Sequence, residues 1–212
     1  EAHDEWRDLL GRVDMEGSDE QKQNLYTSLY HAYVQPNRIS DVDGLYRNAA
    51  DSVVKTSGND FYSTFSLWDT YRAAHPLYTI LNPELVDPFV NSLIEQSEVQ
   101  GHIPLWALWG RDANCMVGNH GVSVIAEAYR KGFKGFDAER AYDAVRRTQT
   151  IPHGPKSPWD IYLKYGYFPS DLIKAESVSS TLETTYDDYA AADMARRLGK
   201  TDDAEMFAAR AD

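Results

Sequence analysis

Three acidic residues near the end of the chain have the types and spacing that acid–base chemistry requires. Glu183 and Asp187 are four residues apart, so they share one face of a helix, and Asp188 lies beside them. Like charges at this spacing make each other harder to ionise, which would help to keep a carboxyl group protonated as a general acid. A solvated acidic face is the alternative, and it is the commoner case. We expect the opposite face to pack on the core; it carries Val178, Leu182, Tyr186 and Met194.

The segment 61–72 is dense in aromatic and hydroxyl side chains. Asp69 and Arg72 lie on the same side of a predicted helix start, and Trp68 adjoins them. An aspartate beside a tryptophan can hold two sugar hydroxyls while the indole covers one face of the ring. The alternative is that Asp69 only caps the helix or forms a salt bridge.

The histidines and the remaining acidic residues show no metal-binding pattern. No two histidines have the HExxH spacing of a zinc helix. His120 stands at a predicted helix start, where it could donate to a ligand or serve as a structural residue. The segment 41–44 begins like a calcium-binding EF-hand loop, but its twelfth position is Ser52, so we interpret it as a turn. Phosphate-binding loops and the GxSxG motif of serine hydrolases are also missing from the sequence.

The composition is that of a globular domain with an acidic surface. The 212 residues are enough for one domain with a sizeable core, and no apolar run approaches the ~20 residues of a membrane span. The net charge of −12 disfavours nucleic acid as a partner. Cys115 is the only cysteine, so the chain forms no internal disulfide. The 14 tyrosines and 5 tryptophans suit sugar stacking, although such rings more often fill a core.

Helical periodicity recurs along the chain, and the alternation typical of strands is hard to find. Pairs of helices joined by short turns are expected, with Ser18 and Gln21 as a capping box, Asp87 and Pro88 starting a helix, and Gly101 ending it. The predicted helical regions are 5–34, 88–100, 122–131, 138–150, 178–198 and 201–212. The predicted long loops are 36–60, 101–118 and 151–177.

The helical pairs predict an all-α fold, arranged as a toroid with functional loops at one end. A tetratricopeptide array would show a 34-residue period, and the sequence has none. The pairs differ in length and their loops differ in character, which favours the toroid.

Several short motifs together resemble glycoside hydrolase family 92, and they follow one another in the order of that family over nearly the whole chain. They are YHAY at 30–33, PN at 36–37, SDVDG at 40–44, FSLWDTYR at 65–72, HP at 75–76, IPLW at 103–106, CMVG at 115–118, VIAEAY at 124–129, KG at 131–132, SVS at 177–179 and TLE at 181–183.

The resemblance implies a calcium-dependent, exo-acting α-mannosidase with an N-terminal β-sandwich and an (α/α)6 catalytic domain. Glu183 matches the family's general acid, and its being Glu favours ordinary mannosides over mannosyl phosphates. Trp68 and Asp69 match positions that line the mannose pocket, and with Arg72 and His120 they form our predicted substrate-binding set. The general base and the calcium ligands belong to later motifs that this sequence lacks.

The sequence therefore predicts that residues 1–212 are an incomplete portion of the (α/α)6 catalytic domain. The sandwich and the rest of the toroid would lie outside this chain, which alone would be inactive. The predicted activity is inverting, calcium-dependent release of terminal α-mannose, with α-1,2 linkage expected, from mannans or N-glycans. The expected location is secreted, periplasmic or cell-surface. Two alternatives are a non-catalytic carbohydrate-binding module and a helical-repeat module that binds proteins.

Overall fold

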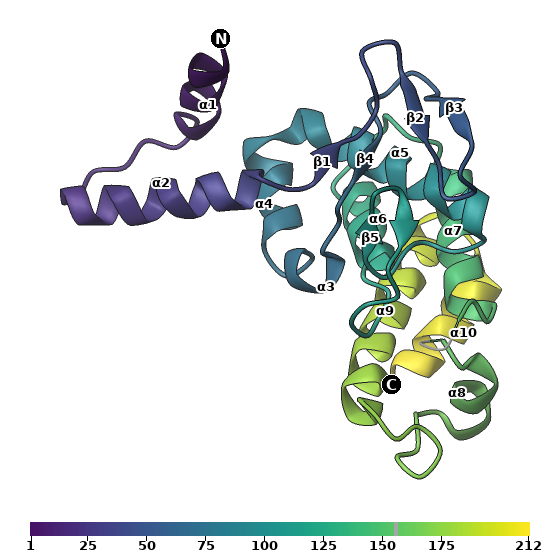
Figure 1. Ribbon diagram of the computed structural model, residues 1–212. Coiled ribbons are helices and arrows are strands. Elements are labelled where there is room, and N and C mark those ends of the chain that lie inside the picture. Colours follow the sequence, from purple (N-terminus) through teal and green to yellow (C-terminus); the bar gives the residue numbers. More distant parts are fainter. Residues whose placement is uncertain (155–156) are drawn as a thin grey trace.

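The computed structural model describes residues 1–154 and 157–212, and most of these residues lie in helices (Figure 1). None of the described helices combines the length and apolar character needed to span a membrane. The helices are α1 (Ala2–Leu10), α2 (Asp19–Tyr33), α3 (Leu67–Thr70), α4 (Ala74–Leu81), α5 (Pro83–Gln100), α6 (Gly121–Arg130), α7 (Ala138–Thr150), α8 (Trp159–Tyr165), α9 (Ser177–Arg197) and α10 (Thr201–Ala211).

The strands are short and pair only in twos. The antiparallel pairs are β1 (Asn37–Arg38) with β4 (Tyr62–Ser63), β2 (Leu45–Arg47) with β3 (Val53–Lys55), and β5 (Ala107–Leu108) with β6 (Arg111–Asp112). The prediction of a mostly helical fold is thus confirmed, while a strictly all-α chain is not what the structure shows. These strands lie in or beside the predicted loops 36–60 and 101–118, and two or three residues are too few for strand periodicity to be read from sequence.

The helix ends follow the local signals in the sequence. Ser18 accepts a hydrogen bond from the Gln21 amide, and the Gln21 side chain accepts one from Ser18, so the capping box is confirmed. Asp137 caps α7, because its side chain accepts hydrogen bonds from the backbone amides of Glu139 and Arg140. Gly101 ends α5 with φ of 90°, a left-handed conformation that glycine adopts readily.

The predicted start of α5 at Asp87 and Pro88 is wrong. The helix begins at Pro83, after Asn82, so Pro88 lies inside the helix. Proline suits the first helical position because its fixed φ is helical and no amide there needs a partner. The sequence offers that signal at Pro83, five residues before the expected start.

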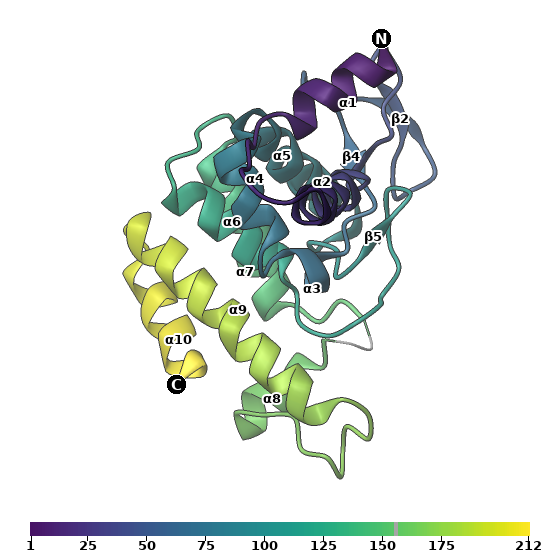
Figure 2. The ribbon, with the colours of Figure 1, turned by 90° about the vertical axis from the view of Figure 1, so that its left-hand side faces the viewer.

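Helices that follow one another pack as pairs, and the pairs share one core. The pairs are α4 with α5, α6 with α7, and α9 with α10, and α9 also packs on α6 and α7 (Figure 2). Core side chains that are fully buried include Leu67, Val90, Leu93, Ile103, Val122, Ile125, Ala141, Val145, Met194 and Phe207.

The first two helices project from this core (Figure 1). Helix α1 buries no side chain, and Leu29 is the buried residue of α2. Hydrogen bonds attach this region to α4: the Tyr78 hydroxyl donates to the Gln35 carbonyl at 3.2 Å, and Arg12 donates to the Leu81 carbonyl at 2.7 Å. The predicted helical pair at 5–34 therefore exists, but it lies at the edge of the fold.

The orientation of α9 corrects a second prediction. Val178 is 71% exposed and Leu182 is 65% exposed, whereas Asp187 and Asp188 are fully buried. Of the four side chains expected to face the core, only Met194 is buried. The buried acids have partners just before α6 and in α10. Long-range polar contacts, which periodicity does not reveal, therefore decide which face of α9 turns inward.

Two truncations on α9 test this orientation. Met194→Ala should destabilise the chain by about 2–5 kcal/mol, because it leaves a cavity in the core. Leu182→Ala, the matched control on the exposed face, should change the free energy of unfolding by no more than about 0.5 kcal/mol. Urea denaturation of both variants measures this, and equal losses would contradict the orientation.

Candidate active site

The carboxylate of Glu183 is the centre of the candidate site. Its side chain is 16% exposed and lies on α9, where side chains from the segment around α3 converge on it. Arg72 Nη2 donates to Oε1 at 2.9 Å, and Trp68 Nε1 donates to the same oxygen at 3.2 Å. The Tyr71 hydroxyl donates to Oε2 at 3.0 Å. Both carboxylate oxygens are therefore bonded to donors that lie more than 100 residues away in the sequence.

The short helix α3 explains how these donors reach one point. It is a single turn, and Tyr71 follows it directly in a helical conformation, so residues 68, 71 and 72 project to the same side. The Arg72 guanidinium lies 4.8 Å from the Trp68 ring centroid and 4.6 Å from that of Tyr71. These cation–π contacts orient a guanidinium that is 46% exposed at its outer side.

A buried histidine lies behind the carboxylate. His120, the residue before α6, is 1% exposed, and its ring stacks on Tyr71 with centroids 3.8 Å apart. Its Nε2 lies 3.2 Å from Glu183 Oε2, and its Nδ1 lies 3.0 Å from Asp187 Oδ1. The imidazole therefore sits between two carboxylates of α9.

A glycine makes this close packing possible. A Cβ at Gly118 would lie 2.7 Å from Glu183 Cβ and 2.7 Å from His120 Nε2, and the φ of this residue is +75°. Both the space and the backbone conformation therefore require glycine.

The electrostatics of the site favour an ionised Glu183. Burial raises the pKa of this carboxyl, but the hydrogen bond from Arg72, the positive charge of His120 and the hydrogen bond from Tyr71 outweigh it. The net pKa lies below the ordinary glutamate value. The like charge of Asp187 therefore does not keep Glu183 protonated, because the positive and donating groups dominate. The pKa of Asp187 is the one that is raised, mainly by burial, and the charge of Glu183 adds to that rise.

Asp69 lies next to this cluster without contacting Glu183 directly. It is exposed and accepts a hydrogen bond from the Ser66 hydroxyl, which in turn accepts from Trp106 Nε1 at 2.7 Å. The chain of contacts fixes the Asp69 carboxylate at the rim of the site. An exposed, oriented carboxylate suits a sugar hydroxyl, and that role stays a prediction.

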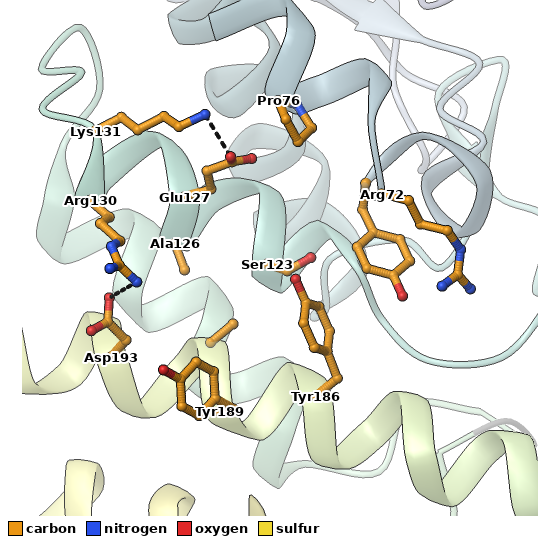
Figure 3. Close-up of a pocket in the computed structure, with 12 residues that line it drawn as sticks. Arg72, Pro76, Ser123, Ala126, Glu127, Arg130, Lys131, Tyr186, Tyr189 and Asp193 are labelled. Carbon is orange, nitrogen blue, oxygen red and sulfur yellow. Dashed lines mark ion pairs between the residues drawn. The ribbon is translucent and has the colours of Figure 1, made fainter.

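A hollow of about 410 Å³ adjoins the site between α4, α6 and α9 (Figure 3). Tyr71 and Arg72 line one end of it, and Tyr186 and Tyr189 of α9 line another side. Ion pairs of α6 border it, with Lys131 2.7 Å from Glu127. Glu183 is not part of its lining, so we assign no reaction to this hollow.

The described residues hold no cluster of acidic, histidine or cysteine side chains suited to a metal ion. Over residues 1–154 and 157–212, no group of three or more His, Cys, Asp or Glu side chains is arranged to hold a metal ion. We therefore assign no calcium ligand to this chain and derive no step through the ion.

The structure brings together most of the residues that the sequence singled out. Trp68, Arg72 and His120 all lie against Glu183, while Asp69 lies at the rim. His120 is buried behind the carboxylate, so its predicted contact with substrate is untested.

Sequence reasoning missed two contributions to the site. Tyr71 lies within the aromatic segment, but nothing in its spacing indicated a bond to Glu183. Asp187 was considered only as a like charge, whereas in the structure it is the partner of His120. A buried pair separated by 67 positions leaves no local sequence signal.

Comparisons with known proteins place the chain among glycosidases. A model described as the glycosyl hydrolase family 92 catalytic domain matches residues 1–212. A search of curated proteins gave no match. Among solved structures, the chain resembles the family GH92 α-mannosidase BT3965 from Bacteroides thetaiotaomicron, with a TM-score of 0.91 and 39% identity over 97% of this chain and 28% of the other.

Two further structural likenesses bear on this chain. The inverting mannosidase BT2199 of the same bacterium has a TM-score of 0.91 and 32% identity, over 99% of this chain and 29% of the other. BT3965 has also been solved in complex with mannoimidazole, with a TM-score of 0.91 and 39% identity over 97% of this chain and 27% of the other. The chain thus spans less than a third of the length of these relatives.

Replacing Arg72 tests the electrostatics of the site. Arg72→Met should raise the pKa of Glu183 toward its ordinary value, because the carboxylate loses a charged donor. A 13C NMR titration of labelled glutamate side chains measures the change. Arg197→Met, which removes an arginine paired with Asp193 farther along the same helix, is the control and should leave Glu183 unchanged. If Glu183 titrates in Arg72→Met as it does in the wild type, the claim that Arg72 lowers its pKa is wrong.

Proposed function

Since the chain belongs to glycoside hydrolase family 92, we propose that it supplies the general acid of an exo-acting α-mannosidase, and that Glu183 is this acid. The observation that carries the proposal is the convergence of Trp68, Tyr71 and Arg72 on a carboxylate that keeps an exposed edge. Such a carboxyl can reach a bound substrate while the protein fixes its orientation.

The proposed reaction begins with the terminal mannose at the rim of the site. The Trp68 indole would cover one face of the sugar, and Asp69 would accept hydrogen bonds from its hydroxyls. Protonated Glu183 would give its proton to the glycosidic oxygen as the C1–O bond breaks. A water molecule, activated by a carboxylate outside this chain, would attack C1 from the opposite face and invert its configuration.

Similarity to the solved relatives supports mannose as the sugar. One of them is described as an inverting mannosidase, and another was solved with mannoimidazole. We extend both properties to the enzyme that carries this chain, with α-1,2-linked mannans or N-glycans as the substrates.

The chain covers less than a third of its solved relatives, so the proposal extends to what the rest of the enzyme would supply. We propose that the helical pairs form part of an (α/α)6 toroid, since paired helices of this kind are its building units. We also propose that calcium and the general base are held outside residues 1–212, and that the enzyme is exported. The family resemblance supports these points, and the chain alone should not hydrolyse mannosides.

The acid assignment makes a prediction about leaving groups. In the enzyme that carries this chain, Glu183→Gln should lower kcat on α-mannobiose by about 10²–10⁴-fold, because the sugar leaving group needs a proton. On 2,4-dinitrophenyl α-mannoside the loss should be much smaller, because that leaving group departs without protonation. Steady-state kinetics on both substrates measures the difference.

Glu176→Gln, an acid just before the same helix, is the control and should keep wild-type rates on both substrates. Wild-type hydrolysis of mannobiose by Glu183→Gln would show that another group is the acid. Equal losses on both substrates would show that Glu183 binds the sugar without protonating it.

A further inference from the structure

The ring of His120 holds an unsatisfied polar atom next to the proposed acid. Its Nε2 is buried and makes no hydrogen bond, although it lies only 3.2 Å from Glu183 Oε2. Buried polar atoms are nearly always paired, so an orphaned nitrogen in contact with a functional carboxylate needs an explanation.

Asp187 determines which ring nitrogen can exchange a proton. Its Oδ1 lies 3.0 Å from His120 Nδ1, and its Oδ2 accepts the Asn119 amide at 2.6 Å. A carboxylate that accepts from both sides requires a hydrogen on Nδ1. Nε2 is then the nitrogen that gains or loses a proton, and it faces Glu183.

The other partners of Glu183 hold it in its ionised form. Trp68, Tyr71 and Arg72 all donate to it, and an ionised carboxylate is the form that accepts from all three. A general acid must carry a proton when the substrate is bound. Of the three donors, Arg72 makes the charged contact and is half-exposed, so it can be displaced by a ligand.

We propose that His120, braced by Asp187, is a positioning residue that stores the proton Glu183 needs. This inference rests on the function proposed for Glu183. When substrate breaks the Arg72 contact, the Nε2–H bond of the imidazolium breaks and an Oε2–H bond forms. The nitrogen keeps the electron pair, and the summed charge of Glu183, His120 and Asp187 stays at −1. Glu183 is thus protonated without taking up a proton from solvent.

Few other groups face the imidazole. Tyr71 covers one face of its ring, and the Tyr186 ring lies at 6.1 Å between centroids. The charged groups that act on it are Glu183 and Asp187 from α9, with Arg72 beyond Glu183. A proton held between His120 and Glu183 is therefore shared by groups that are in direct contact.

The basic limb of the pH–rate profile reports the loss of that proton. His120→Asn removes the group that stores the proton. Glu183 then holds a proton only below its own pKa, which Arg72 and Tyr71 still lower. Asp187→Asn removes the negative charge that favours the imidazolium. On α-mannobiose, each variant of the enzyme should lose at least ~10-fold in kcat, and its basic limb should move about one pH unit lower. Arg72→Met should move the limb in the opposite direction.

If His120 has only a structural role, its replacement should lower kcat without moving the pH of the basic limb. That result would overturn the proposal. Folding of each variant is checked by circular dichroism and by its thermal unfolding, which do not depend on sugar binding. A different result would show that Glu183 is not the general acid: Glu183→Gln would then hydrolyse mannobiose at the wild-type rate.

If the His120 and Asp187 variants do not fold, NMR of the His120 imidazole ring provides a second test. In 15N-histidine-labelled enzyme, both His120 nitrogens should carry protons near neutral pH in the absence of substrate. In Glu183→Gln the ring should lose its proton at a lower pH, because one of its two carboxylates is gone. If the His120 ring of the wild-type enzyme is still neutral at about pH 5, His120 does not hold the proton for Glu183.

Discussion

Two adjacent carboxylates buried on α9 constrain the rest of the structure. Asp187 and Asp188 are both fully buried, and a buried charge is tolerated only with hydrogen-bonding or oppositely charged partners. Asp187 finds them in His120 and the amide before it, at the start of α6. Asp188 finds them in Arg210 of α10, which contacts both of its oxygens at 2.7 and 2.9 Å. The position of Glu183, one turn earlier, follows from these anchors.

The same pairing places buried groups behind the Glu183 carboxylate, while the front of the site is partly exposed. Burial raises the pKa of Asp188 to about 7, although Arg210 and Gln149 oppose this shift. Removing Arg210 would leave a buried carboxyl group without its charged partner, which is strongly destabilising. At the front, Arg72 keeps nearly half of its surface exposed and can respond to a ligand.

Local features of the fold could be predicted from the sequence, and its long-range pairings could not. Ser18 and Gly101 each fix a helix end through contacts within a few residues, and the structure confirms both predictions. The inward face of α9 was predicted wrongly, because its apolar stripe is more conspicuous than the acids that the fold buries. For the site, motif resemblance identified Trp68 and Glu183, but their hydrogen bond joins positions 115 residues apart and only the fold reveals it.

The central claim is that the Glu183 carboxyl protonates the glycosidic oxygen. Mannoimidazole places a basic nitrogen where that oxygen would lie, so a crystal structure of the enzyme that carries this chain with this inhibitor tests the claim most directly. The account predicts a Glu183 oxygen within about 2.6–3.2 Å of that nitrogen, with Arg72 moved off the carboxylate. A different carboxyl group at that nitrogen, with the Arg72–Glu183 pair intact, would contradict it.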